Sequence, residues 1–260
     1  MRIPFLLFLL MALSFSGVAL QSQTIHAVVV ADTESKQSEF AESATADFRN
    51  MRIMFKGMAE ETGYPLRMYE VGGAEFVSEN VKKAISLVEA QPNDIIFFYF
   101  AGKGACDPGV SAEERILHMG QEGADTISTA TVAGLIKKKN ARLNVVLIDA
   151  CGTIWDAGVG PHKGAGAEKI YYKLLRACGT VKVYSSQCGE LSYGDKKGGY
   201  FTNSSLAALD YYITNPSDPV SWKALLTKTA LLTRQRAMRI FRPQSPVVFF
   251  SQDFRESCLP

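Results

Sequence analysis

The chain has 260 residues, of which 47% are hydrophobic and 21% charged, which is the composition of an ordinary globular protein and excludes a disordered or fibrous one. The net charge of +2 indicates no polyanionic partner such as nucleic acid. The length is sufficient for one large α/β domain but not for two.

The first residues predict a cleaved export signal. Met1 and Arg2 form a short basic start, the run from Ile3 to Leu13 is almost continuously apolar, and Gly17 and Ala19 are small residues suited to cleavage. The apolar run is short for a membrane span, and no second run follows. We therefore expect a signal peptide over residues 1–19, an exported (periplasmic or extracellular) product and no stable membrane span after cleavage; an uncleaved anchor is the alternative.

The hydrophobic pattern then predicts strands that alternate with helices. Strands are expected at Thr24–Ala31, Leu66–Val71, Asp94–Phe100, Arg115–Met119, Asn144–Ile148, Val181–Ser185 and Val247–Phe250. Helices are expected from Phe40 to Met58 with an end at Gly63, after a Ser78 cap, after Ser128, around Tyr171 to Cys178, at Phe201–Ile213 and at Ser221–Met238. Pro246 suits an edge position for the last strand.

This alternation implies crossover connections between parallel strands. The expected fold is α/β: a three-layer sandwich with a mostly parallel six-stranded sheet flanked by helices. It covers residues 24–251, with residues 252–260 as a C-terminal tail. Ligands of such sheets bind beyond the carboxyl ends of the strands. Lys103, Cys151 and Cys188 all follow such ends and are therefore candidates for a functional site.

Two of these strand ends resemble caspase-type cysteine peptidases. The run Phe97-Phe98-Tyr99-Phe100 leads into Ala101-Gly102-Lys103-Gly104, and the run Val145-Val146-Leu147-Ile148 leads into Asp149-Ala150-Cys151-Gly152. Caspases and metacaspases place a catalytic His-Gly after the first strand and a nucleophilic Cys after the second. Three later runs are similar to family segments in the same order: Ser185 to Glu190, Gly198 to Thr202 and Gln244 to Val247.

The resemblance implies a role for each matching residue. Cys151 would be the nucleophile, and the backbone amides of Cys151 and Gly104 would form the oxyanion hole. Asp149, as in metacaspases, would help line a pocket for a Lys or Arg side chain, with Asp32 as a second acid. Ser185 and Ser186 would border the substrate cleft. From the residues alone, Cys151 is equally a small buried cysteine, and Asp149 a solvated or capping carboxylate.

Lys103 departs from the family pattern, because it occupies the position of the catalytic histidine. A general base needs a pKa near the working pH, which histidine has and an ordinary lysine, at about 10.4, does not. The histidines of the chain, His26, His118 and His162, do not follow a strand end, so we expect core or solvated positions for them. Whether the protein is an enzyme therefore depends on this substitution.

We therefore predict an exported caspase/metacaspase-like domain of the cysteine endopeptidase family with impaired or absent activity. One alternative is an active endopeptidase that uses a Cys151–Lys103 pair and prefers basic residues. The other is a non-catalytic module that binds a peptide or protein partner; the oligomeric state stays open. No cofactor and no metal are expected, since the chain has no Cys-x-x-Cys or His-x-x-x-His pair.

The five cysteines are too few and too irregular for a disulfide scaffold. We expect all five to be reduced and mostly buried. The alternative is a bridge between Cys106 and Cys151 that would mask the nucleophile. A bridge between Cys178 and Cys188 is not expected, because one extended strand separates them.

Overall fold

The computed structural model describes residues 23–106, 111, 113–120, 123–150, 153–154 and 166–259, with the backbone alone for 153 and 154. The expected signal peptide, Cys151 and His162 lie outside the described residues. No helix in the described ranges is long and apolar enough to cross a membrane.

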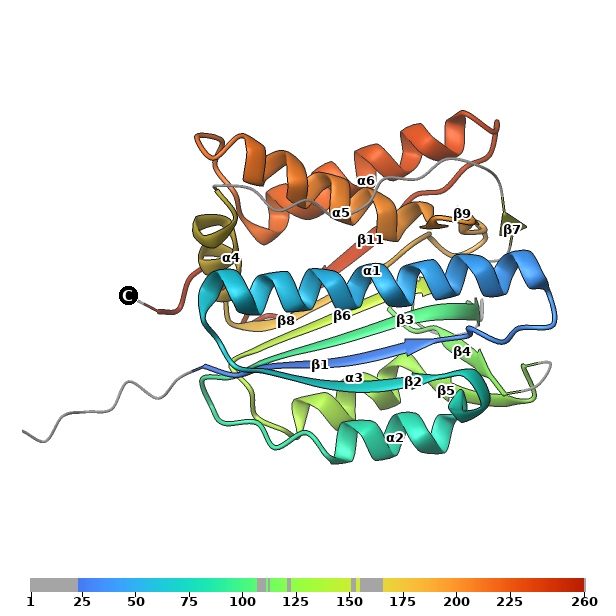
Figure 1. Ribbon diagram of the computed structural model, residues 1–260, viewed down its shortest axis with the longest axis horizontal. Coiled ribbons are helices and arrows are strands. Elements are labelled where there is room, and N and C mark those ends of the chain that lie inside the picture. The colour runs from blue at the N-terminus through green and yellow to red at the C-terminus, as the bar shows by residue number, and fades with distance from the viewer. Residues whose placement is uncertain are drawn as a thin grey trace, which may run out of the picture.

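A mostly parallel sheet forms the centre of the domain (Figure 1). Its main path has the order β11-β8-β6-β3-β1-β2, and every neighbouring pair is parallel except β11 with β8. These strands span Ile25–Ala31 (β1), Leu66–Gly72 (β2), Ile95–Ala105 (β3), Leu143–Ala150 (β6), Gly179–Tyr184 (β8) and Val247–Phe250 (β11). The predicted parallel sheet is confirmed, and the strand that follows Pro246 lies at an edge.

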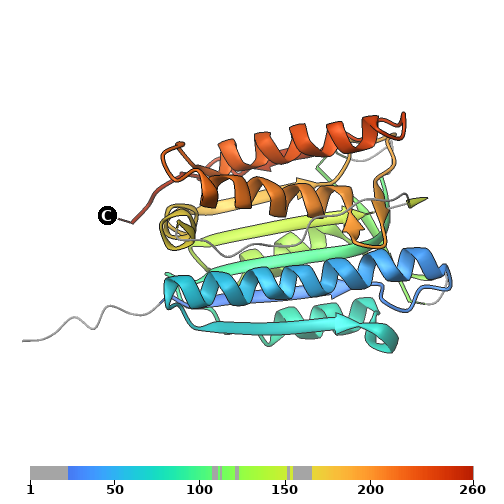
Figure 2. The ribbon, with the colours of Figure 1, turned by 45° about the horizontal axis from the view of Figure 1, so that its top comes forward.

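Helices cover both faces of the sheet and complete the three layers (Figures 1 and 2). One face packs against α1 (Ser38–Thr62), α4 (Ala167–Leu175), α5 (Tyr200–Thr214) and α6 (Trp222–Met238). The other face packs against α2 (Ser78–Ser86) and α3 (Thr129–Lys137), and a short 3₁₀ helix, η1 (Gly73–Glu75), precedes α2. The α/β fold class expected from the sequence is confirmed.

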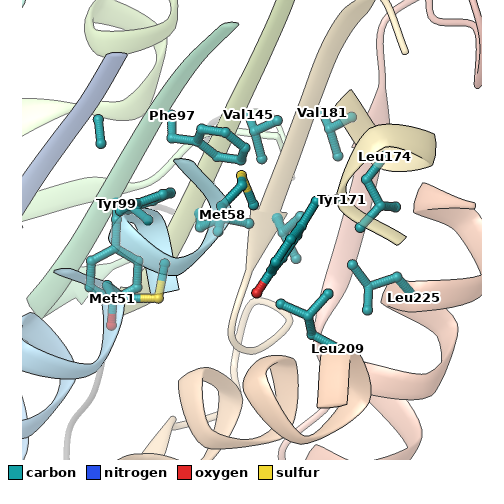
Figure 3. Packing of buried hydrophobic residues seen from close by; sticks show 14 of the residues in the cluster. Met51, Met58, Phe97, Tyr99, Val145, Tyr171, Leu174, Val181, Leu209 and Leu225 are labelled. Atoms are coloured by element: carbon teal, nitrogen blue, oxygen red, sulfur yellow. The ribbon is translucent and has the colours of Figure 1, made fainter. Parts of the chain in front are cut away.

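Successive side chains of each strand point to opposite faces of the sheet and so belong to two separate halves of the core. On β3, Phe97 and Tyr99 face α1 and α4–α6, whereas Phe98 and Phe100 face α2 and α3. The first half of the core is drawn in Figure 3, where residues of four helices surround the sheet side chains. Because both faces are covered, the strands are continuous apolar runs rather than alternating ones.

Local signals explain several helix ends. The helix α1 ends at Gly63, whose φ of 68° is the left-handed conformation that glycine tolerates best. Ser128 caps α3 by accepting a hydrogen bond from the Thr131 amide. Ser78, in contrast, was expected as a cap but is the first helical residue of α2, and its hydroxyl donates to Asp125. Its prediction as a cap is therefore wrong.

Smaller strands lie beyond the predicted ones. β3 continues past Phe100 and pairs with β4 (Ile116–Met119), which forms an antiparallel hairpin with β5 (Asp125–Ser128). A second small sheet contains β7 (Thr153–Ile154), β9 (Tyr193–Asp195) and β10 (Gly198–Gly199). Of these, the sequence predicted β4 alone.

Two disulfides correct the expectation of five reduced cysteines. Cys106 bonds to Cys188, with their Cα atoms 5.5 Å apart, and Cys178 bonds to Cys258, at 5.8 Å. The expected alternative, Cys106 with Cys151, is also wrong, because the end of β3 lies next to the segment that follows β8. Four of the five cysteines are thus paired, and Cys151 has no cysteine of this chain left to pair with.

Candidate active site

Strand register brings the two family motifs together. Ala101 of β3 pairs with Asp149 of β6, and Gly102 pairs with Ala150. The next residue along each chain segment is Lys103 on one side and Cys151 on the other, and Cys151 lies outside the described residues. The strands are close at this point: a Cβ on Gly104 would lie 2.8 Å from the Ala150 Cβ. Glycine is therefore required where the family places its oxyanion amide.

Lys103 is half-buried and is surrounded by groups that favour a cation. Its Nζ lies 5.6 Å from the centre of the Phe40 ring, at the beginning of α1. It also interacts electrostatically with Asp32, which follows β1 and whose amide donates to the Ala101 carbonyl at 2.9 Å. Burial raises the pKa of Asp32, while Lys103 and a hydrogen bond from Ser35 act against that increase. The structure thus places two predicted site residues, Lys103 and Asp32, in the lining of one cavity.

A cavity of about 510 Å³ opens beside this pair. Its wall includes Asp32, Glu34, Phe76, Lys103 and His118. His118 was expected in the core or in solvent, but it is half-buried at the cavity because it is the register partner of Lys103 across β3 and β4. Its Nδ1 lies 3.4 Å from the Gly123 carbonyl oxygen. Its position depends on the extension of β3 beyond Phe100, for which the small or polar residues Ala101 to Ala105 give no clear sequence signal.

Asp149 is buried, with 1% of its surface exposed, and binds the beginning of α5. Its Oδ2 accepts hydrogen bonds from the Thr202 amide at 3.1 Å and the Thr202 hydroxyl at 2.7 Å. Burial raises the pKa of Asp149 to about 6, although Thr202 and the nearby Ser185 hydroxyl act in the opposite direction. Its other oxygen, Oδ1, has no hydrogen-bond partner among the described residues. Asp149 therefore caps α5, and its second oxygen is buried.

Sequence reasoning missed a second buried carboxylate next to Asp149. Both oxygens of Asp47, on α1, accept hydrogen bonds from the Gly199 amide, at 3.0 and 2.9 Å. Burial and then the charge of Asp149 raise the pKa of Asp47 well above its usual range. A Cβ on Gly199 would overlap the Asp149 carboxylate, so this position requires glycine. The signal that could have identified Asp47 is its spacing, three residues after Ala44 and four before Met51, which places it on the buried face of α1.

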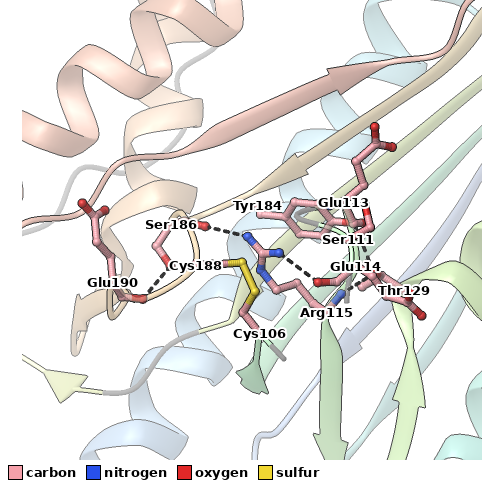
Figure 4. Close-up of a disulfide and its surroundings, with 10 residues drawn as sticks. All are labelled: Cys106, Ser111, Glu113, Glu114, Arg115, Thr129, Tyr184, Ser186, Cys188 and Glu190. Carbon is pink, nitrogen blue, oxygen red and sulfur yellow. Dashed lines mark hydrogen bonds between the residues drawn. A yellow bond between two sulfur atoms is a disulfide. The ribbon is translucent and has the colours of Figure 1, made fainter. Parts of the chain in front are cut away.

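Ser185 and Ser186 lie at the end of β8, as predicted, and both have partners within their own loop. The buried Ser185 hydroxyl lies next to that of Ser192. The Ser186 hydroxyl donates to the Glu190 carbonyl at 3.1 Å, and its own carbonyl accepts from Arg115 at 3.3 Å. Figure 4 shows the two hydrogen bonds of Ser186 beside the Cys106–Cys188 disulfide, with the Arg115 guanidinium over the Tyr184 ring.

Fold and strand ends together define an α/β domain of the caspase type. The model of the caspase domain family matches residues 25–248, and the chain belongs to this family. Among solved structures, the crystal structure of protein GSU0716 from Geobacter sulfurreducens is similar, with a TM-score of 0.55 and 14% sequence identity over 88% of this chain and 93% of that chain. At this identity the likeness shows the fold alone. No curated protein matches the chain.

Proposed function

We propose that the chain is an exported, caspase-like protein whose peptidase activity is impaired or absent because Lys103 stands at the position of the catalytic histidine. The observation that carries the proposal is the environment of Lys103. Its ammonium lies near the Phe40 ring, and Lys103 interacts electrostatically with Asp32 in the lining of the same cavity. Both neighbours favour a positive charge at this position, whereas a general base would need neighbours that favour its neutral form.

A cation beside a thiol has a limited chemical effect. It favours the thiolate and so increases the reactivity of the cysteine. Amide hydrolysis also requires a proton for the leaving amine, which histidine delivers near neutral pH and a charged lysine does not. The expected chemistry of Cys151 with Lys103 is therefore rapid alkylation without substantial turnover.

A peptide that ends in an arginine amide, in a fluorogenic form and in a thiol-reactive form, tests this proposal. The wild-type protein should be labelled at Cys151 and should turn over the fluorogenic peptide negligibly. Lys103→His should increase turnover about 100-fold or more, the usual contribution of general acid–base catalysis. Lys103→Met is the matched control, since it removes the charge without supplying a base, and Cys151→Ala should abolish labelling. Strong wild-type turnover that Lys103→His lowers would favour an active Cys151–Lys103 peptidase instead.

The free oxygen of Asp149 favours a second candidate function, the binding of basic peptides. A buried carboxylate oxygen without a donor is costly unless a ligand supplies one. A Lys or Arg side chain would supply that donor and a compensating charge. In the Cys151→Ala background, the arginine peptide should bind more tightly than a norleucine analogue. Asp149→Asn should remove that preference, whereas equal affinity for both peptides would exclude the basic subsite.

Export is supported by the two disulfides as well as by the first residues. Disulfides persist in oxidising compartments and are rare in reducing ones. Expression of the full chain in a bacterium should give a periplasmic or secreted product that begins at residue 20. Intact-mass measurement of the product tests this, and a cytoplasmic product that retains residues 1–19 would contradict it.

A further inference from the structure

The small net charge of the chain hides an uneven distribution. From Trp222 to Gln252, the segment that includes α6 and β11, there are six basic residues and no acidic one, so the remainder of the chain has a net charge of −4. The basic residues are Lys223, Lys228, Arg234, Arg236, Arg239 and Arg242. The total charge, from which no polyanionic partner was predicted, therefore does not describe this segment.

The outer face of α6 combines this charge with exposed apolar side chains. Leu231, Arg234, Met238 and Arg239 recur at helical spacing opposite the buried face of the helix, and all are exposed. The side chains of Leu231 and Met238 are 50% and 69% exposed. Basic and apolar groups thus share one surface towards the C-terminal end of the helix.

Phe241 continues this surface, and neither packing nor backbone geometry explains it. Its exposed fraction is 95%, and its φ is 55°, in the left-handed region. The Arg242 amide donates to the Ala237 carbonyl, and the Phe241 amide donates to the Met238 carbonyl. These two bonds define the helix-terminating turn in which this position normally holds glycine. A phenylalanine here loses backbone stability and gains no burial.

We propose that Leu231, Met238 and Phe241, surrounded by Arg234, Arg239 and Arg242, form a docking surface for an anionic lipid membrane. Phenylalanine and methionine would enter the interfacial region of the membrane, while the arginines would contact lipid phosphates. Apolar and basic residues have these separate roles in many peripheral membrane segments. The side-chain length of arginine allows this, because its stem lies along apolar surface while the guanidinium reaches the headgroups. The surface lies at the end of the molecule to which the parallel strands run (Figure 1), so a docked protein presents its candidate site towards the membrane.

Sedimentation with vesicles tests the proposal on the mature protein. Vesicles of phosphatidylglycerol and phosphatidylcholine in equal parts should bind the protein, and vesicles of phosphatidylcholine alone should not. Phe241→Gly is the decisive variant, because glycine suits the left-handed turn. The variant should therefore unfold at a temperature equal to or higher than that of the wild-type protein. Its binding to the anionic vesicles should nevertheless fall about 10-fold or more, because the variant lacks the aromatic side chain that would be buried in the membrane.

Charge is tested by the pair Arg239→Gln and Arg242→Gln, which should weaken binding about 30-fold if each arginine contributes about 1 kcal/mol near the membrane. The matched control is Lys137→Gln with Lys138→Gln, two exposed lysines at the C-terminal end of α3, on the other face of the sheet. Leu87→Ser, at an apolar residue that is 57% exposed, is the control for Phe241. Equal loss in the controls would overturn the proposal. Failure of the wild-type protein to bind anionic vesicles would also overturn it. In that case, loss of self-association or of acidic-peptide binding in Phe241→Gly would identify a protein partner for this surface instead.

Discussion

Asp149 and Thr202 connect the carboxyl end of β6 to the first turn of α5. The Thr202 amide and hydroxyl both donate to the same carboxylate oxygen, at 3.1 and 2.7 Å, and the hydroxyl also lies 2.7 Å from the Tyr99 hydroxyl. A carboxylate at a helix N-terminus satisfies an amide that has no partner within the helix and interacts favourably with the helix dipole. The residue that the family pattern assigns to substrate binding thus also holds the fold together at this point.

Thr202→Val replaces the hydroxyl by a methyl group of similar size and should therefore destabilise the protein through the lost hydrogen bond. It removes a hydrogen bond to a buried carboxylate, for which about 1.5–3 kcal/mol of unfolding free energy is expected. Denaturant unfolding measures the difference. Thr233→Val is the matched control, because Thr233 is equally buried but donates only to the Thr229 carbonyl of its own helix. A loss at Thr202 no larger than that at Thr233 would contradict the capping role.

The raised pKa of Asp149 predicts how stability changes with pH. Its pKa is about 6 in the folded protein against a usual value of 3.8, so the folded state binds the proton more tightly than the unfolded state does. The resulting stability is present below about pH 4 and is lost as the pH rises to about 6. Asp149→Asn lacks this dependence. The unfolding free energy of the variant relative to wild type should therefore increase by about 2 kcal/mol from pH 4 to pH 7.

Chemical denaturation of both proteins across that pH range measures this difference. Asp47 is buried in contact with the same helix end and also has a raised pKa. Asp47→Asn should therefore change stability in the same direction, whereas Asp125→Asn should not, because hydrogen bonds from Ser78 lower the pKa of Asp125. A variant curve for Asp149→Asn that runs parallel to wild type would exclude the buried, titrating carboxylate.

The sequence predicted the sheet and its helices well because hydrophobic periodicity records burial directly. The run from Ile95 to Phe100 has no charged residue and only one polar group, the Tyr99 hydroxyl, as suits a strand covered on both faces. The extension of β3 to Ala105 was missed because its residues, Ala101 to Ala105, are small or polar, and their pairing depends on β4. The position of His118 beside Lys103 follows from that pairing and was missed with it.

The partners of the candidate site residues were less predictable, because they come from distant parts of the chain. Asp149 binds a residue 53 positions later, and Cys106 pairs with a cysteine 82 positions later. Each strand end in a parallel sheet has several neighbours, and periodicity does not distinguish between them. The family motif located Cys151 and Lys103 in the sequence, but the contact of Lys103 with Phe40 on α1 required the folded structure.

Lys103→Met should raise the pKa of Asp32. Burial already raises that pKa, and the charge of Lys103 is the larger of the two influences that oppose the increase. Methionine keeps the contact with the Phe40 ring but has no charge. Titration of the side-chain carboxyl carbon by NMR measures the change, with Lys36→Met as a control that removes a neighbouring charge of the same cavity. No difference between Lys103→Met and wild type would exclude the interaction with Asp32.

The two disulfides predict one reactive thiol per chain. Under denaturing conditions without reductant, the mature protein should react with one equivalent of a thiol reagent, and Cys151→Ala with none. Reduction should then expose the other four cysteines. Peptide mapping should recover Cys106 linked to Cys188 and Cys178 linked to Cys258. A mapped bridge that contains Cys151 would contradict this pairing.

The Cys178–Cys258 bridge should stabilise the domain through its C-terminal segment. It closes a loop with a sequence separation of 80 residues, for which chain entropy predicts about 4–5 kcal/mol and typical measurements give about 2–5 kcal/mol. Replacement of both cysteines by serine should lower the unfolding free energy by an amount in that range. The backbone bonds between Cys178 and Arg255, at 3.0 and 3.2 Å, hold the same segment without the bridge, so the variant should still fold. Denaturant unfolding without reductant measures the loss of unfolding free energy. A change below about 0.5 kcal/mol, the usual size of a surface effect, would show that the backbone bonds alone already constrain this segment.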